Sequence, residues 1–199
     1  MNCQFCEKNA FYKCSVCGNL VCAEHTKLRA TCPLCTKKTA THYKIKKVTT
    51  NEERTQIRRF VNRFWEEQEQ LTFDKRYVVA ELPAYAAKVK DSLVGFISFA
   101  DEGGNVIIVG LGVLPKHQGS SVGKSLVEAV GNEARKLGNE KLLVSTSNDD
   151  LPALAFYQSL GFQIYEVNPN VIAKKHGRVL KGIGGLPIRD ELRLHEILT

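Results

Sequence analysis

The sequence lacks the long apolar run that a membrane-spanning helix needs, because no stretch of about 18 apolar residues occurs in it. Its N-terminus is rich in cysteine and does not have the order of a secretory leader. We therefore expect a soluble cytoplasmic protein that makes no contact with a membrane. A chain of 199 residues with 43% hydrophobic content is long enough to bury one ordinary core plus a small stapled module.

Cysteine is absent after residue 35, and the seven cysteines before that point are an odd number, which argues against a pure disulfide framework. Together with one histidine they form four pairs, each with two residues between its members: Cys3/Cys6, Cys14/Cys17, Cys22/His25 and Cys32/Cys35. Eight such ligands predict two tetrahedral zinc sites. Residues 1–40 hold too few apolar side chains to fold without metal, so we expect a zinc-binding domain over residues 1–41.

The short gap between the second and third pairs favours two interleaved zinc sites. One would use Cys3, Cys6, Cys22 and His25, and the other Cys14, Cys17, Cys32 and Cys35. This spacing resembles the cross-brace fingers of the B-box kind, although those usually end with histidines where this chain has Cys32 and Cys35. Sequential pairing of the ligands remains open.

Residues 48–199 carry no net charge, because 19 basic residues balance 19 acidic ones, and the whole net charge of +7 lies in residues 1–47. Seven thiolates with two zinc ions would reduce that segment to about +4. A basic surface of this size is as often an ordinary solvated face as a nucleic-acid patch. We expect an interaction module whose partner is a protein or a nucleic acid.

The stretch from Val106 to Leu137 organises the rest of the chain. A β-branched apolar run predicts a buried strand, Pro115 ends it, and apolar residues at helical spacing follow a loop that contains glycine. Unpaired N–H groups at such a helix start hold phosphate oxygens. A P-loop does not fit, because its leading glycine would stand at position 118, which is Gln118.

The loop Gln118 to Gly123 resembles the [QR]-x-x-G-x-[GA] pyrophosphate loop of the GNAT acetyltransferase superfamily, with Ser121 where that pattern prefers glycine. Asn148 to Phe162 resembles the second GNAT signature, N-x-x-A-x-x-[FL]-Y-x-x-x-G-F. The resemblance implies an α/β protein with the mixed sheet of the acyl-CoA N-acyltransferase fold over residues 42–199. It also implies binding of acetyl-CoA (coenzyme A) and places Tyr157 to protonate the leaving sulfur. The cofactor-binding residues that it implies are Leu111, Gly112, Val113, Gln118, Gly119, Ser120, Ser121, Val122, Gly123, Lys124 and Asn148. Among them, the N–H of Gly112 or Val113 would face the thioester oxygen as an oxyanion donor, and Asn148 would hydrogen-bond the pantetheine arm.

Around this centre, the sequence predicts a first strand near residues 42–49 and a helix that starts at Thr50 to Glu53. The helical stripe that runs from Ile57 to Trp65 is interpreted as core. An antiparallel meander follows. The GNAT resemblance implies a substrate-side loop near residues 71–83, and it implies that the central strand separates from its parallel neighbour between residues 111–114 and 147. The basic excursion at residues 174–181 would cover the substrate mouth, touch the nucleotide phosphates, or be a plain solvated loop.

The general base is missing from the predicted central strand, because residues 106–114 contain no ionisable side chain. Glu102 and Glu81 are weak candidates, and a chain of water molecules would serve instead. We favour an acetyl-CoA-dependent N-acetyltransferase that acts on an amine of an unidentified substrate, which a protein or peptide could supply, with the finger binding that substrate or another partner. The alternative is a non-catalytic sensor or adaptor that binds coenzyme A.

Overall fold

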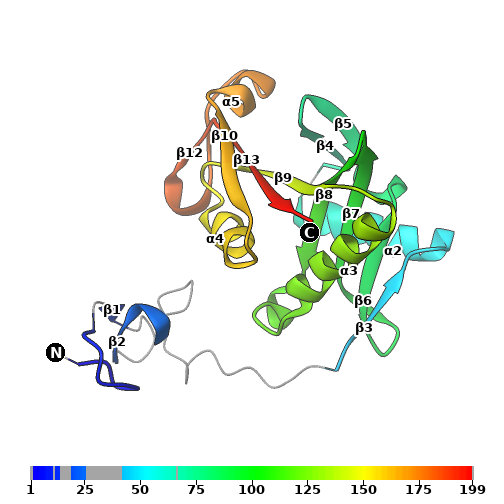
Figure 1. Cartoon of the computed structure of the whole chain (residues 1–199). Coiled ribbons are helices and arrows are strands. Elements are labelled where there is room, and N and C mark those ends of the chain that lie inside the picture. Colours follow the sequence, from blue (N-terminus) through cyan, green and yellow to red (C-terminus); the bar gives the residue numbers. More distant parts are fainter. Residues whose placement is uncertain (1, 11, 14–18, 26–41, 66, 199) are drawn as a thin grey trace. The chain divides into compact units, whose positions relative to one another are not determined.

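The computed structural model describes residues 2–10, 12–13, 19–25, 42–65 and 67–198. The chain divides into two compact units, Met1–Ala40 and Thr41–Thr199 (Figure 1). No helix among the described residues is long and apolar enough to cross a membrane.

A seven-stranded mixed sheet forms the centre of the larger unit, in the order β10-β13-β9-β8-β7-β6-β3. Neighbouring strands are antiparallel except for the central pair, β8 and β9, which is parallel. This is the mixed α/β architecture that the sequence predicts. The strands are β3 (Lys44–Lys47), β6 (Ala84–Val89), β7 (Ser92–Glu102), β8 (Asn105–Val113), β9 (Lys141–Ser147), β10 (Gln163–Asn168) and β13 (Glu191–Ile197).

Helices cover both faces of this sheet and define two apolar clusters. Helix α2 (Asn51–Phe64) begins with a capping box, in which Thr50 and Glu53 each bond the other's backbone N–H, and it buries Ile57, Phe60 and Val61 on one face. On the other face lie α3 (Val122–Lys136) and α4 (Leu151–Ser159). Of the predicted core stripe, Ile57, Phe60 and Val61 are therefore buried, Trp65 packs against their cluster, and Phe64 is exposed.

The two central strands pair for only part of their length, from Asn105 opposite Lys141 to Ile108 opposite Val144. A bulge at Val109 interrupts the β7–β8 register immediately after this point, since Ser98 pairs with Gly110 and Phe99 with Ile108. Bulges bend a strand and increase its twist. Beyond the bulge, β8 and β9 separate, where the sequence predicts a gap.

Two segments that were expected to be loops contain regular structure. Residues 69–78 form a hairpin of β4 (Glu69–Thr72) and β5 (Lys75–Val78), and the short helix α5 (Val171–Lys175) ends in the basic segment 174–181. Further short pieces are the 3-10 turns η2 (Val79–Glu81), η3 (Pro115–His117) and η4 (Ile183–Gly185), and the strands β11 (Leu180–Lys181) and β12 (Pro187–Ile188).

In the smaller unit, β1 (Tyr12–Lys13) pairs with β2 (Leu20–Val21), and the 3-10 turn η1 (Ala23–His25) follows. Its described apolar cluster consists of Cys3, Val21 and Cys22, with Phe5, Cys6 and Ala10 packed against them.

Candidate functional site

The loop before α3 has the backbone conformation of an anion site. Gly119 and Ser121 both adopt positive φ, at 74° and 65°, and α3 begins directly after Ser121 with no acidic residue in its first turn. The left-handed conformation explains why the GNAT pattern prefers glycine at this position, and serine occupies it at a cost of about 1 kcal/mol. The first N–H groups of α3 thus face a region that favours negative charge.

Two other predicted loop residues are held by neighbouring elements. Gln118 donates from Nε2 to the carbonyl oxygen of Val113 at 3.1 Å, which ties the loop to the end of β8. Gly123 lies inside α3, where a Cβ atom would come within 3.2 Å of the Phe156 ring. Glycine at this position therefore permits close packing of α3 on α4. Of the remaining loop residues, the hydroxyl of Ser120 donates to the His117 carbonyl oxygen, Val122 is buried, and the exposed Lys124 pairs with Glu128.

The backbone of β8 beyond the bulge presents alternate N–H groups to the gap. Leu114 donates to the carbonyl of Val94 on β7, and the register then makes Gly112 and Phe96 a hydrogen-bonded pair. The N–H of Gly112 consequently points toward β7, whereas the N–H groups of Leu111 and Val113 point toward the edge that β9 has left. Of the two predicted oxyanion donors, Gly112 and Val113, only Val113 has the required direction. Gly112 has a packing role instead, since a Cβ there would lie 2.6 Å from the Phe60 ring.

A cavity of about 690 Å³ opens at this gap, and residues from both faces of the sheet line it. Its walls come from the end of α2, the β4–β5 hairpin, the bulged part of β8, the end of β9, the start of α4, and α5. Phe64 and Trp65, interpreted from the sequence as core, line this cavity. The other residues used below that line it are Glu67, Asp74, Gly110, Leu111, Asp149, Asp150, Tyr157, Lys175, His176 and Glu191.

Tyr157 lines the cavity from the last turn of α4. It is only 6% exposed, its ring packs against Phe156 and Phe162, and no described residue hydrogen-bonds its hydroxyl. Burial raises the pKa of Tyr157 well above its usual range, and the charge of Asp150 raises it further. The phenol is therefore neutral at ordinary pH and can donate its proton.

Asn148, predicted to bond the pantetheine arm, has other partners in the structure. Its Nδ2 donates to the Pro187 carbonyl at 2.7 Å, and its Oδ1 accepts from the N–H groups of Arg189 and Asp190. These bonds fix the segment that leads into β13. The side chain acts here as a clamp between the end of β9 and β13.

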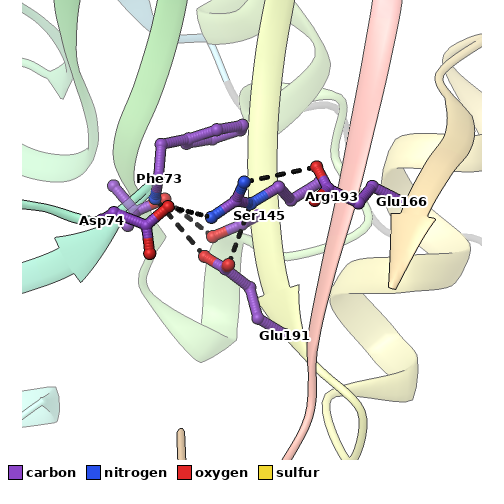
Figure 2. Close-up of polar contacts among 7 residues, drawn as sticks. Phe73, Asp74, Ser145, Glu166, Glu191 and Arg193 are labelled. Atoms are coloured by element: carbon purple, nitrogen blue, oxygen red, sulfur yellow. Dashed lines mark hydrogen bonds and ion pairs between the residues drawn. The ribbon is translucent and has the colours of Figure 1, made fainter. Parts of the chain in front are cut away.

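A group of charged residues surrounds Arg193 where the hairpin tip meets β9 and β13 (Figure 2). Its guanidinium bonds Glu191 (2.9 Å), Asp74 (2.9 Å) and Glu166 (3.2 Å), and it lies over the ring of Phe73. Nearby, the hydroxyls of Thr72 and Ser145 lie 2.7 Å apart. The hairpin is thereby fastened across the α2 side of β9.

Neither carboxylate proposed from the sequence as a base lines the cavity. Glu102 accepts from Lys75 and from the Tyr77 hydroxyl, and Glu81 pairs with Arg58. Five other carboxylates line the cavity instead: Glu67, Asp74, Asp149, Asp150 and Glu191. They come from four separate segments, so no local motif in the sequence could have identified them as one group.

In the smaller unit, Cys3, Cys6, Cys22 and His25 bring their ligand atoms within 4.8 Å of one another. Sγ of Cys6 lies 3.7 Å from Sγ of Cys22, and the three sulfurs lie 3.3–3.6 Å from His25 Nδ1. Tetrahedral zinc with Zn–S bonds of about 2.3 Å separates two sulfurs by about 3.8 Å. The four residues fit a zinc ion, and they are the first of the two interleaved sets. The second set, Cys14, Cys17, Cys32 and Cys35, lies outside the described residues.

Comparison with known proteins identifies the family of this chain. The profile of the Acetyltransferase (GNAT) family matches residues 49–162. The chain is 30% identical over 126 residues to the uncharacterized protein YdhI of Bacillus subtilis, covering 59% of this chain and 76% of that protein. It is 28% identical over 112 residues to the uncharacterized N-acetyltransferase YvbK of the same organism, covering 56% and 72% of the two chains.

Among solved structures, a Bacillus subtilis acetyltransferase in complex with CoA superposes with a TM-score of 0.60 at 23% identity, covering 79% of this chain and 100% of that one. That likeness supports the fold, and the profile match spans more than half of the sequence. The chain belongs to the GNAT acetyltransferase family.

Proposed function

We propose that the protein is an acetyl-CoA-dependent N-acetyltransferase that transfers the acetyl group directly to an amine. The observation that carries the proposal is the opening between β8 and β9, which leads into the cavity where the Tyr157 hydroxyl has no hydrogen-bond partner among the described residues. Solved relatives with CoA or acetyl-CoA bound support the choice of cofactor.

Coenzyme A fits the residues at the gap. The N–H groups that follow Gly119 and Ser121 would hold its pyrophosphate, and the outward-facing backbone of Leu111 and Val113 would pair with its pantetheine arm as an added strand does. In this arrangement Gln118 and Asn148 would act indirectly. Gln118 holds the loop before α3, and Asn148 holds the segment that precedes β13. Bound acetyl-CoA supplies an activated acyl group as a thioester.

Transfer forms a C–N bond on the acceptor and breaks the C–S bond, so nitrogen must lose a proton and sulfur must gain one. The Val113 or Leu111 N–H would stabilise charge on the acyl oxygen, and Tyr157 would protonate sulfur. A cavity carboxylate, directly or through water, would accept the proton of the amine.

We propose further that Cys3, Cys6, Cys22 and His25 hold one zinc ion and that Cys14, Cys17, Cys32 and Cys35 hold a second. The basic surplus of residues 1–47 suits a finger that binds a protein or nucleic-acid partner. The finger would then choose or hold the molecule on which the larger unit acts.

The experiment is a paired measurement on the full-length protein. Calorimetry with acetyl-CoA should show one saturable site, and mass spectrometry should detect N-acetylated product from a simple primary amine. Saturable binding without any product would favour the adaptor alternative. Absence of both would contradict the assignment of the gap.

A further inference from the structure

The charges that line the cavity do not balance. Five carboxylates line it, against one lysine, Lys175, and one histidine, His176. Arg193 does not line the cavity, but it pairs with two of these carboxylates, Asp74 and Glu191. Arg193 is shared among three carboxylates, and Lys175 pairs with Glu67 at 3.6 Å. A surplus of negative charge therefore remains after every ion pair of the described residues is counted.

Two of the carboxylates have only neutral donors. Asp149 accepts from the Ser147 hydroxyl and the Ile183 N–H, and Asp150 accepts from the Ala153 N–H. Neither forms an ion pair within the described part of the chain. Burial raises the pKa of Asp150, and the neighbouring Asp149 raises it further, as expected where negative charge is not compensated.

Glu191 is the most deeply placed acceptor in the charged group of Figure 2. It is 5% exposed, and its Oε2 accepts from Arg193 Nε. The other oxygen, Oε1, receives only a long 3.4 Å contact from the Phe73 N–H among the described donors. A buried carboxylate oxygen with so weak a partner gains most from a second cation.

The second observation is Tyr157, which is 94% buried, lines the same cavity, and has no hydrogen-bond partner among the described residues. It marks the place of acetyl transfer at the β8–β9 gap. Glu191 stands on β13, one strand beyond β9. Adjacent strands lie about 4.8 Å apart, so Glu191 is roughly 5 to 10 Å from the gap, on the order of the length of a short linear diamine.

Resting on the proposed acetyl transfer, we propose that the acceptor carries a second cationic group besides the amine that reacts, and that Glu191 binds that group. The reacting amine must be neutral to attack, so the negative cavity acts on the part of the acceptor that stays protonated. The hairpin tip and α5 then bound the space through which such a cation enters.

Three acceptors of equal chain length test this: 1,5-diaminopentane, pentylamine and 5-aminopentanoate. For the full-length protein we expect kcat/KM to be at least tenfold higher for the diamine than for pentylamine, and lowest for the amino acid. Glu191→Gln keeps the shape and can still accept from Arg193, and it should reduce the preference for the diamine to within threefold.

Glu166→Gln is the matched control, because Glu166 also bonds Arg193 but does not line the cavity. It should leave the preference for the diamine intact, and an equal loss in both variants would overturn the role of Glu191. Fluorescence of Trp65, the one tryptophan, verifies that each variant is folded.

Calorimetry with 1,5-diaminopentane in the presence of coenzyme A provides a readout that needs no turnover. Saturable binding that weakens at least tenfold in Glu191→Gln supports the subsite. If the wild type binds the diamine no better than pentylamine, the proposal is overturned. Diamine binding without acetylated product from any of the three amines would refute the acetyl transfer while supporting the cationic subsite.

Discussion

Tyr157 has both a packing role and a proposed chemical role, and one substitution can distinguish them. Tyr157 is part of the apolar cluster on the α3 and α4 side of the sheet, and it also lines the cavity. Tyr157→Phe keeps the ring, so we expect stability and coenzyme A affinity to change little. Acetyl transfer should slow by roughly 10- to 1,000-fold, because a thiol leaving group with a pKa near 8.5 needs only assistance from an acid. Pre-steady-state turnover with a simple amine measures this effect, and an unchanged chemical rate would remove Tyr157 from the mechanism.

Ser121 is a strained residue at the start of α3. Its φ of 65° favours glycine, and its hydroxyl makes no capping bond to α3. Ser121→Gly should stabilise the protein by about 1 kcal/mol and leave coenzyme A affinity within tenfold, since the backbone N–H groups stay in place. Ser121→Asp should weaken the affinity strongly, because it puts negative charge against the pyrophosphate. Denaturant unfolding and calorimetry test the two parts separately, and equal affinity of the Asp variant would mean that the phosphates bind elsewhere.

At the scale of single residues, the sequence indicated which residues belong to the site better than it indicated the hydrogen bonds that they form. Tyr157 lines the cavity, but the side chain of Asn148 bonds Pro187, Arg189 and Asp190. Those partners lie about forty positions further along the sequence, so no local sequence pattern predicts them. Similarly, Gly112 looked like an oxyanion donor, and only the register of β7 against β8 shows that its N–H points the other way.

Among the elements, α2 has a start that both sequence and structure identify. The capping box joins Thr50 and Glu53, and Lys88 on β6 donates to Glu53 at 2.8 Å. This bond, together with the N–H groups of Thr49 and Thr50, lowers the pKa of Glu53 to about 2. A carboxyl with a depressed folded-state pKa stabilises the protein above its unfolded pKa, and that stabilisation is lost as the pH falls toward 2.

Glu53→Gln should therefore reduce the free energy of unfolding at pH 7 by on the order of 2 kcal/mol, while glutamine still completes the capping box. The difference from the wild type should shrink as the pH falls from 4.5 toward 2. Urea titrations followed by Trp65 fluorescence measure it in the larger unit. A difference that does not vary with pH would show that the charge of Glu53 contributes nothing to stability.

The β4–β5 hairpin is the element that the sequence did not reveal. Its turn residues are Phe73 and Asp74, which adopt φ of 50° and 61°. Two-residue hairpin turns are usually recognised in a sequence by Asn-Gly or Asp-Gly, and this turn has neither. Tertiary contacts hold the turn instead, through Arg193 against the Phe73 ring and the Asp74 carboxylate. The strands and helices from Ala84 to Ser159 were predictable because glycine turns, apolar runs and the two signatures are all local features.

At the scale of the whole chain, charge and cysteine divide at the same place as the compact units. The surplus of positive charge lies in residues 1–47, and every cysteine precedes residue 36. The larger unit has its own sheet and two apolar clusters. If the proposed zinc sites form, the smaller unit draws its stability from metal coordination, whereas the larger unit draws its own from apolar burial.

This division predicts that loss of metal leaves the coenzyme A site intact. Cys22 is 3% exposed, and its sulfur lies 3.3 Å from His25 Nδ1, so serine there removes a central ligand of the described set. Zinc binding contributes about 10 to 16 kcal/mol in such modules, and Cys22→Ser should lower the zinc content and unfold residues 1–40. Coenzyme A affinity should stay within threefold of the wild type.

Native mass spectrometry gives the zinc content, and calorimetry gives the affinity for coenzyme A. Lys8→Ala is the control, because it changes an exposed residue of the same unit without removing a ligand. An unchanged zinc content in Cys22→Ser would contradict the zinc site proposed for Cys22. Loss of coenzyme A binding together with zinc would show that the larger unit depends on the finger for its fold.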